Sequence, residues 1–130
     1  MRHRIQTIKQ QQFMDITNKV ADEVKNSNVR DGIAVIYVPH TTAGVTINEN
    51  ADPDVVRDMI FALDKMCPAQ EEYFHSEGNS HAHMKASLLG SSCTVIIQDG
   101  KLLLGTWQGI YFCEFDGPRN REFYVKIISG

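Results

Sequence analysis

The chain has 130 residues, and its hydrophobic content of 42% and charged content of 22% are those of a globular protein with its own core. The net charge of −3 argues against a nucleic-acid-binding protein, because phosphate contacts need an excess of Lys and Arg. The length fits one domain over residues 1–130. No run approaches the ~20 apolar residues of a membrane span, and the N-terminal segment lacks the apolar region of a signal peptide, so we expect a cytosolic protein.

Three cysteines, Cys67, Cys93 and Cys113, are widely spaced and odd in number. Because they form no CxxC pair, they indicate neither a redox motif nor a thiolate zinc site. Each lies in or beside apolar residues, so we expect reduced thiols in or near the core. That pattern suits a reducing compartment.

The first part of the chain predicts a strand, a helix and a second strand. Residues 2–12 alternate loosely and indicate an opening strand. Apolar residues at spacings of three and four then predict an amphipathic helix. These residues are Phe13, Ile16, Val20 and Val24. After a turn at Asp31-Gly32, the β-branched and apolar run at residues 33–38 is typical of a strand buried on both faces.

A polar, flexible segment follows this strand and leads to a second helix. Residues 40–54 are poor in large apolar groups, which predicts a loop. Asp52 is a suitable N-cap, and Pro53 fits the first helical position, where its missing N–H costs nothing. The apolar face of this helix comes from Val56, Ile60 and Leu63, and Pro68 ends it.

The second half of the chain, from Ser91, is rich in strand signals. Four runs, SCTVIIQ, KLLLGTW, GIYFCEF and EFYVKII, are linked by short segments that include Asp99-Gly100 and Gly117-Pro118. Such short links favour an antiparallel meander. We therefore predict an α+β fold with about six or seven strands and two helices packed on one side of the sheet.

The first candidate site begins where the strand at residues 33–38 ends. His40 follows this strand closely, and Thr41, Thr42 and Gly44 come next. Hydroxyls and backbone N–H groups in a Gly-containing loop can hold a phosphate oxygen. The alternative is a strand-end turn in which the Thr side chains cap backbone groups.

A second candidate is the segment INENAD, residues 47–52. Its oxygen-bearing side chains are those of Asn48, Glu49, Asn50 and Asp52. Oxygen ligands suit magnesium or calcium. The alternative is that Asp52 is only the helix N-cap and the other side chains solvate the loop.

The third candidate is the run His81, His83 and Lys85. In an extended chain these residues point to the same side, so the two imidazoles could bind one metal. The third ligand would come from His40, His75 or Glu77. Lys85 would suit an anionic ligand. The alternative is the solvated face of a strand.

Trp107 and Arg119 complete the candidate residues. Trp107 is the only Trp and stands beside small or polar residues, so its ring could stack on a flat heterocycle or belong to the core. Arg119 lies at a turn, where it could bind phosphate through both guanidinium nitrogens or be a simple exposed side chain.

Three segments, PHTTAGVTINENADPDV, GNSHAHMKASLLGSS and DGKLLLGTWQGIYFCEFDGPR, together resemble the YjbQ family over essentially the whole chain. The resemblance implies an α+β fold and a homotrimer. It also implies a thiamine-phosphate synthase activity, which joins hydroxymethylpyrimidine diphosphate to a thiazole phosphate and releases pyrophosphate. The matching polar positions are His40, Thr41, Thr42, Asn48, Glu49, Asn50, Asp52, His83, Lys85, Trp107 and Arg119. Many relatives have Asp in place of His81.

The combined hypothesis is a small enzyme acting on a phosphorylated metabolite, with neither nucleic acid nor membrane as partner. The expected catalytic residues are His40, Glu49, His83 and Lys85. The expected substrate-binding residues are Thr41, Thr42, Asn48, Asn50, Trp107 and Arg119. A divalent metal is expected, either zinc or another transition metal at His40, His81 and His83, or magnesium carried by the substrate. The alternatives are a metal-dependent hydrolase of a phosphorylated metabolite and a non-catalytic metal- or ligand-binding protein.

Overall fold

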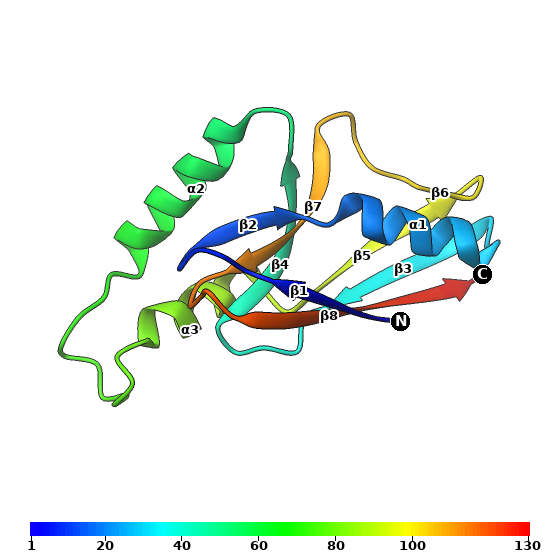
Figure 1. The fold of residues 1–130 in the computed structure, drawn as a ribbon. Helices are drawn as coiled ribbons and strands as arrows, with labels where there is room; N and C mark the ends of the chain where they lie inside the picture. Colours follow the sequence, from blue (N-terminus) through cyan, green and yellow to red (C-terminus); the bar gives the residue numbers. More distant parts are fainter.

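Eight antiparallel strands and three helices make up the fold in a computed structural model that describes residues 1–130 (Figure 1). The strands are β1 (Arg2–Gln6), β2 (Gln12–Asp15), β3 (Asp31–Tyr37), β4 (Ala43–Glu49), β5 (Ser92–Gln98), β6 (Lys101–Leu102), β7 (Gln108–Glu114) and β8 (Asn120–Ser129). The helices are α1 (Thr17–Ser27), α2 (Pro53–Met66) and α3 (Ser80–Leu89). The predicted α+β class is therefore confirmed, with one helix more than expected.

The strands form two sheets. One has five strands in the order β1-β8-β3-β5-β6, and the other has three in the order β2-β7-β4. The last four strands do not form the expected meander, because β7 and β8 lie in different sheets. The physical reason is the composition of β7, whose residues from Gly109 to Glu114 are all buried, so this strand belongs at the centre of a covered sheet.

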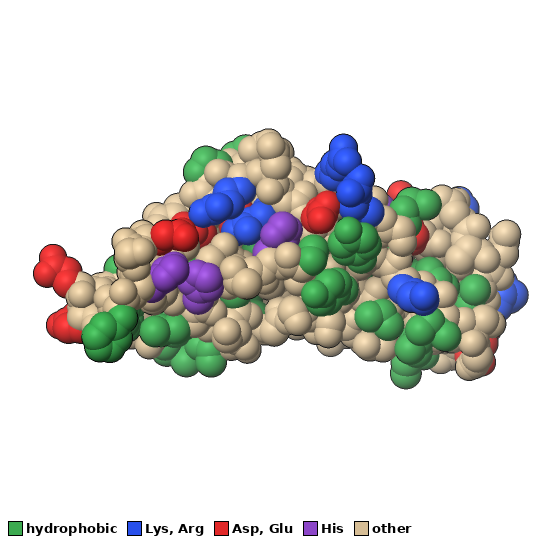
Figure 2. Space-filling model, turned by 90° about the horizontal axis from the view of Figure 1, so that it is seen from below, with side chains coloured by type: hydrophobic (Ala, Val, Ile, Leu, Met, Phe, Trp, Pro, Cys, Tyr) green, Lys and Arg blue, Asp and Glu red, His purple; other side chains and the backbone are tan.

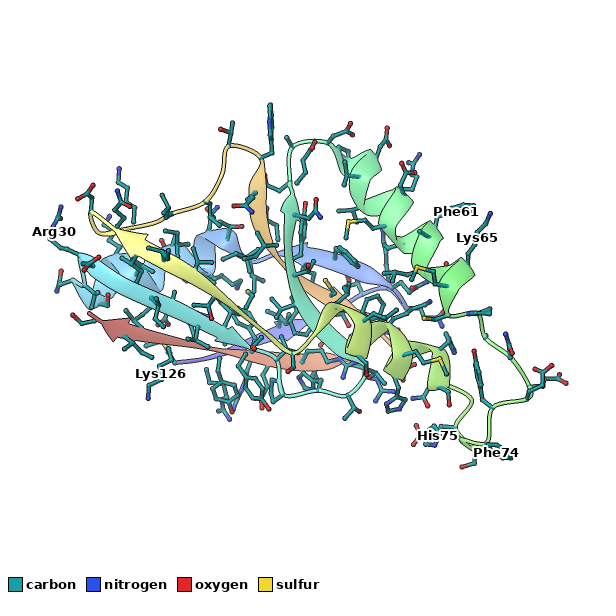
Figure 3. All side chains as sticks on the ribbon, turned by 180° about the vertical axis from the view of Figure 1, so that it is seen from behind. Arg30, Phe61, Lys65, Phe74, His75 and Lys126 are labelled. Carbon is teal, nitrogen blue, oxygen red and sulfur yellow. The ribbon has the colours of Figure 1, made fainter.

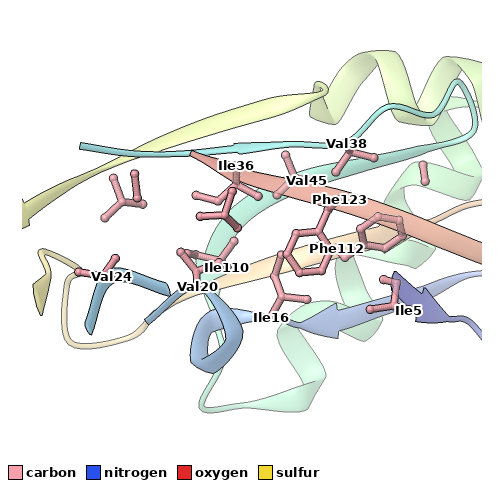
Figure 4. Close-up of a cluster of buried hydrophobic side chains, with 14 of the residues drawn as sticks. Ile5, Ile16, Val20, Val24, Ile36, Val38, Val45, Ile110, Phe112 and Phe123 are labelled. Atoms are coloured by element: carbon pink, nitrogen blue, oxygen red, sulfur yellow. The ribbon is translucent and has the colours of Figure 1, made fainter. Parts of the chain in front are cut away.

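The main core lies between the two sheets. The five-stranded sheet contributes residues such as Ile36 and Phe123, and the three-stranded sheet contributes Val45 and Phe112 (Figure 4). Helix α1 adds its predicted apolar stripe to the same cluster. Its members there are Val20 and Val24, with Ile16 just before the helix.

A second apolar cluster lies on the other face of the three-stranded sheet. Tyr111 and Cys113 of β7 pack there with Leu63 of α2 and Ala82 and Ala86 of α3. The three-stranded sheet is thus covered on both faces, by the five-stranded sheet and by the α2–α3 pair. The two helices lie together at one end of the molecule (Figure 1).

Helix α2 follows its prediction closely. The Asp52 carboxylate accepts a 2.9 Å hydrogen bond from the Asp54 N–H, Pro53 opens the helix, and the helix ends before Pro68. Helix α1 begins later than Phe13, because the Asp15 carboxylate accepts hydrogen bonds from the backbone N–H and hydroxyl of Thr17. Phe13 instead belongs to β2.

Two segments differ in type from their predictions. The segment after His40 was expected to be a loop, but Ala43–Glu49 is a strand because its small residues fit between the layers, where Ala43 and Val45 are buried. The strand expected around His81 is wrong: Ser80–Leu89 is helix α3. The hairpin at Asp99-Gly100 is confirmed, with φ values of 53° and 78° as a type I′ turn requires.

The outer face of the five-stranded sheet is not covered. Strand β3 was expected to be buried on both faces, yet Ile33 and Val35 are half-buried and Tyr37 is exposed. Ile96 and Tyr124 on the neighbouring strands are also exposed, and apolar side chains gather on this part of the surface in Figure 2.

The remaining expectations about the whole chain concern thiols and membranes. All three cysteines are free, two of them buried and Cys93 half-buried, as predicted. Burial raises the pKa of the Cys93 thiol to about 11, so this thiol is unreactive near neutral pH. None of the three helices is long and apolar enough to cross a membrane.

Candidate functional site

A polar pocket of about 380 Å³ lies where the segment after β3 meets α3 and the β7–β8 turn. Apart from the ring of Pro39, its lining is polar or charged: His40, Thr41, Thr42, His75, Glu77, Asn79, His83, Arg119 and Arg121. A neighbouring cavity of about 470 Å³ beside α3 shares His40, Thr41 and His83 with it. Figure 2 shows His side chains at the left and near the centre of the face that it displays, with basic and acidic side chains beside them. We call this cavity the His40–His83 pocket.

Close packing of α3 against β4 brings the two sides of this pocket together. A Cβ at Gly44 would lie 2.6 Å from the Gly90 carbonyl oxygen, so only glycine permits this approach. The same carbonyl accepts a 3.1 Å hydrogen bond from the Val45 N–H. Helix α3 is therefore held against the strand that follows His40, and His83 faces the pocket.

Arg121, which lines the pocket, belongs to a buried ion pair. The Arg121 Nε donates to Glu114 Oε1 at 2.9 Å, and its Nη2 donates to Glu114 Oε2 and, at 2.8 Å, to Thr42 Oγ1. Glu114 is fully buried and also accepts from the Thr7 hydroxyl at 2.7 Å. Burial alone raises the pKa of Glu114, but the hydrogen bonds from Arg121 and Thr7 lower it below its usual value. The carboxylate is thus ionised and fixes the guanidinium in place.

His40 is held as a neutral imidazole with its proton on Nδ1. Its Nε2 accepts a 3.0 Å hydrogen bond from the Glu122 N–H, which is possible only when Nε2 is unprotonated. Burial and the positive charge of Arg121 lower the pKa of His40. His40 can therefore donate a hydrogen bond from Nδ1, whereas its Nε2 is unavailable to a metal or a proton.

His83 is the imidazole on the opposite side of the pocket. Its side chain has no hydrogen-bond partner within the chain, and its ring lies perpendicular to that of His75, with the ring centres 5.4 Å apart. His75 Nε2 lies 3.8 Å from Glu77 Oε1. His75 and Glu77 belong to the loop before α3, and Figure 3 shows His75 near the end of this loop beside Phe74. His83 is thus free to take part in proton transfer or ligand binding.

Arg119 borders the pocket from the β7–β8 turn. Its Nε and Nη2 donate to the backbone oxygen and carboxylate of Asp116 at 2.7 and 2.8 Å, and about half of its side chain is exposed. The turn packs tightly, since a Cβ at Gly117 would lie 2.4 Å from the Lys9 carbonyl oxygen. Asp116 also accepts from the Asn79 side chain at 2.8 Å, which ties the turn to the start of α3.

Helix α3 separates Lys85 and His81 from His83. Residues two apart on a helix point about 200° apart, whereas residues four apart share a face. Lys85 is accordingly buried on the other side of the helix, where its Nζ donates to Asp64 and, at 3.0 Å, to Gln11. The hydrogen bond from Lys85 is the main cause that lowers the pKa of Asp64, and the charge of His81 contributes. The expectation that these residues share one side, and with it the spacing argument for one metal on both histidines, is wrong.

The residues at the C-terminal end of β4 lie away from both the His40–His83 pocket and the Lys85 side of α3. Asn48, Glu49 and Asn50 lie about 20 Å along the strand from Thr42. There the Asn50 side chain donates to Asp15 at 3.0 Å, and its backbone N–H donates to the carbonyl of Trp107. Trp107 itself is 61% exposed. Within one chain, these predicted residues do not meet the His40–His83 pocket.

The sequence prediction did not include Glu114, Asn79 or Arg121 among the site residues. The signal for Glu114 is a single carboxylate in the otherwise apolar run GIYFCEF, which demands a buried cationic partner. His75 and Glu77 were considered only as further metal ligands. No three His, Cys, Asp or Glu side chains come together as a metal centre in the structure.

The state of His40 gives a direct prediction. At pH 7 we expect Nε2 to be unprotonated and Nδ1 protonated, with a titration midpoint below the ordinary value of 6.5. Because the pKa of His40 is lower in the folded chain than in the unfolded chain, the unfolded chain binds the proton first as the pH falls below 6.5. The contribution of His40 to the free energy of unfolding therefore decreases from pH 6.5 down to the lower midpoint. Long-range ¹⁵N–¹H NMR across a pH titration measures both properties. A proton on Nε2 at pH 7, or a midpoint at or above 6.5, would contradict the assignment.

Comparisons with known proteins, by sequence and by structure, identify one family for this chain. The model of the family described as UPF0047 protein YjbQ-like matches residues 1–130. UPF0047 protein MJ1081 of Methanocaldococcus jannaschii is 60% identical over 98% of this chain and 93% of its own length. UPF0047 protein YugU of Bacillus subtilis is 52% identical over 97% of this chain and 96% of its own.

Solved structures of proteins from the same family have the same fold as this chain. A YjbQ/UPF0047 family protein of Clostridium acetobutylicum has a TM-score of 0.97 at 61% identity, covering 98% of this chain and 99% of that one. A YbjQ-like protein of unknown function from Sulfolobus solfataricus has a TM-score of 0.95 at 32% identity, covering 100% and 96%. This chain belongs to the YjbQ/UPF0047 family.

Proposed function

We propose that this chain is an enzyme that acts on a small phosphorylated metabolite in the His40–His83 pocket. The observation that carries the proposal is the fixed guanidinium of Arg121, set in an almost entirely polar cavity beside Arg119. The planar fork of arginine matches the geometry of phosphate oxygens. The hydroxyls of Thr41 and Thr42 line the same cavity and add further hydrogen-bonding groups.

The residues of the pocket divide into charge-stabilising and proton-transferring groups. Arg119 and Arg121 would bind phosphate oxygens, and the Nδ1–H of His40 would donate to a third oxygen. His83 would accept or supply a proton, since its imidazole has no other partner in the chain and histidine is suited to proton transfer near neutral pH. Lys85 would support this arrangement from behind α3, because Asp64 and Gln11 already bind its ammonium group.

The reaction that we propose is the one implied by the family resemblance, the formation of thiamine phosphate. The ring nitrogen of the thiazole phosphate forms a bond to the pyrimidine methylene carbon as the bond from this carbon to the diphosphate oxygen breaks, and pyrophosphate leaves with the electron pair of that bond. The leaving pyrophosphate carries the negative charge that builds up, so Arg119, Arg121 and magnesium carried by the diphosphate would stabilise it. This activity can be a secondary one in a pocket that serves another phosphorylated substrate.

A metal-dependent hydrolase is the second candidate. His83, His75 and Glu77 line the same cavity and carry nitrogen and oxygen donors of the kind that zinc binds, although the structure does not bring them together as a metal centre. Binding of one metal would require the loop that carries His75 and Glu77 to move toward His83. These three residues replace His40, His81 and His83 as the proposed ligand set, because His81 points elsewhere and Nε2 of His40 is occupied. Release of inorganic phosphate from a panel of phosphorylated compounds, by protein whose elemental analysis shows one bound metal per chain, would favour this candidate over the synthase.

A non-catalytic binding protein is the third candidate. It predicts tight binding of a phosphorylated compound with no turnover of any substrate. We favour an enzyme because the pocket holds an unpaired imidazole, that of His83, in addition to the two guanidinium groups that binding alone would need. The three free thiols support the proposal that the protein works in the cytosol.

A homotrimer is the further proposal that the resemblance implies. The uncovered face of the five-stranded sheet supports it, because β3 has the composition of a strand buried on both faces. We expect sedimentation to give three times the chain mass of 14.7 kDa, and Ile96→Glu on this face to give single chains. Phe61→Glu, at an exposed apolar residue of α2, is the control. A single-chain mass for the unmodified protein would contradict the proposal.

The enzymatic proposal is tested with Arg119→Gln. In the presence of magnesium, hydroxymethylpyrimidine diphosphate and thiazole phosphate, we expect kcat/KM to fall about 10- to 100-fold, the usual effect of losing charged hydrogen bonds. Arg57→Gln is a matched control, because Arg57 is also an exposed arginine paired with an aspartate three residues away, but on α2. Absence of thiamine phosphate with the unmodified protein, or equal losses in both variants, would reject the synthase reaction in this pocket.

A further inference from the structure

A second polar cavity lies on the other side of His40 and Arg121. It has a volume of about 720 Å³ and, apart from Ile5, is lined by Arg4, Gln6, His40, Asn120, Arg121 and Glu122. These residues come from β1, the start of β8 and the segment after β3. We call it the Arg4 pocket. Its only common wall with the His40–His83 pocket is the pair His40 and Arg121.

We propose that the Arg4 pocket binds the phosphate group of a second substrate. This inference rests on the proposed function, because a coupling reaction between two phosphorylated molecules needs two anionic groups bound close to one another. The shared wall provides that closeness. A ligand in each pocket would lie against the same guanidinium and the same imidazole.

The first support is the unpaired state of Arg4. In the register of β1 and β8, Arg4 stands opposite Glu122 and Gln6 opposite Asn120. The Glu122 carboxylate lies 3.8 Å from Arg2 Nε and forms no ion pair with Arg4. In the single chain, the guanidinium of Arg4 is therefore exposed and without a partner, and Arg4 lines the cavity. An unpaired guanidinium in such a position can bind a phosphate through two parallel hydrogen bonds.

The second support is the set of unused hydrogen-bond donors on Arg121 and His40, the two residues that line both pockets. Arg121 uses Nε and Nη2 for Glu114 and Thr42, while its Nη1 has no partner in the chain. This Nη1 carries two N–H groups, so one can bind an anion in each pocket, whereas the single Nδ1–H of His40 serves only the ligand of the His40–His83 pocket. Both side chains are held in place, Arg121 by Glu114 and His40 by the Glu122 N–H. Fixed donors bind an anion without the cost of ordering long side chains.

The charge balance favours an anion. Three arginines, Arg2, Arg4 and Arg121, lie in or beside the Arg4 pocket, against the two carboxylates of Glu114 and Glu122. Among these five side chains, one positive charge is therefore not balanced. The amide groups of Gln6 and Asn120 add neutral donors beside it.

The test is the binding of inorganic pyrophosphate to the intact protein, measured by isothermal titration calorimetry without any second substrate. We expect the unmodified chain to bind two pyrophosphate ions. Arg4→Gln should weaken one of these sites at least tenfold and leave the other unchanged. Arg119→Gln should weaken the other site. Both arginines are exposed, at least in part, so neither change disturbs the core.

Lys126→Gln is the matched control for Arg4→Gln. Lys126 is an exposed cation on β8 (Figure 3), so its loss changes the net charge equally. It does not line the Arg4 pocket. Equal weakening in the two variants would overturn the inference, because the effect would then be general electrostatic attraction. Binding of a single pyrophosphate per unmodified chain would also overturn it.

Turnover separates this inference from the proposed function. In the coupling assay, Arg4→Gln should raise KM at least tenfold for one of the two phosphorylated substrates and not for the other. If turnover is absent but the two-site binding pattern holds, the synthase reaction fails and the second site stands. If turnover occurs and Arg4→Gln alters neither KM, the second site is rejected and the proposed function stands.

Discussion

The buried pair of Glu114 and Arg121 is the interaction on which the functional end of this molecule depends. Glu114 ends β7 of the three-stranded sheet and Arg121 lies on β8 of the five-stranded sheet, so their hydrogen bonds join the two layers. Thr7 and Thr42 complete the network. Loss of one partner from a buried pair costs about 3–5 kcal/mol, because the other charge is left uncompensated. The two carboxylate bonds and the threonine bonds together offset the cost of removing both charges from water.

The same pair sets the chemistry of the surface above it. Because Glu114 fixes Arg121, the guanidinium stands permanently beside His40, where burial and its charge keep the imidazole neutral. A neutral His40 with Nε2 occupied is a hydrogen-bond donor, and the pocket leaves His83 as the imidazole available for proton transfer. One rigid cation thus lines two polar cavities, and this arrangement would hold two phosphorylated molecules close together, as the proposed reaction between them needs. Family membership is shown by the comparisons, whereas the reaction remains our proposal.

Much of the fold could be predicted from the sequence, because its signals are local. The Asp52-Pro53 helix start, the Asp99-Gly100 hairpin and the apolar runs of β3 and β8 each carry their own pattern. Helix α3 could not be recognised, since small residues and histidines give it no apolar stripe and its position depends on packing against Gly44. Prediction of the site also required tertiary information. His40 and His83 were correctly identified as neighbours in one pocket. The separation of Lys85 and Glu49 from them depends on helix α3 and strand β4, which local sequence patterns do not reveal.

The most direct test of this account is a crystal structure of the protein with inorganic pyrophosphate. The account predicts phosphate density in the cavity between His40 and His83, in contact with Arg119 or Arg121, while Arg121 keeps its two hydrogen bonds to Glu114. Density only at other surfaces, or an Arg121 side chain turned away from Glu114, would contradict the claim that a fixed arginine at the junction of the two sheets creates an anion-binding site.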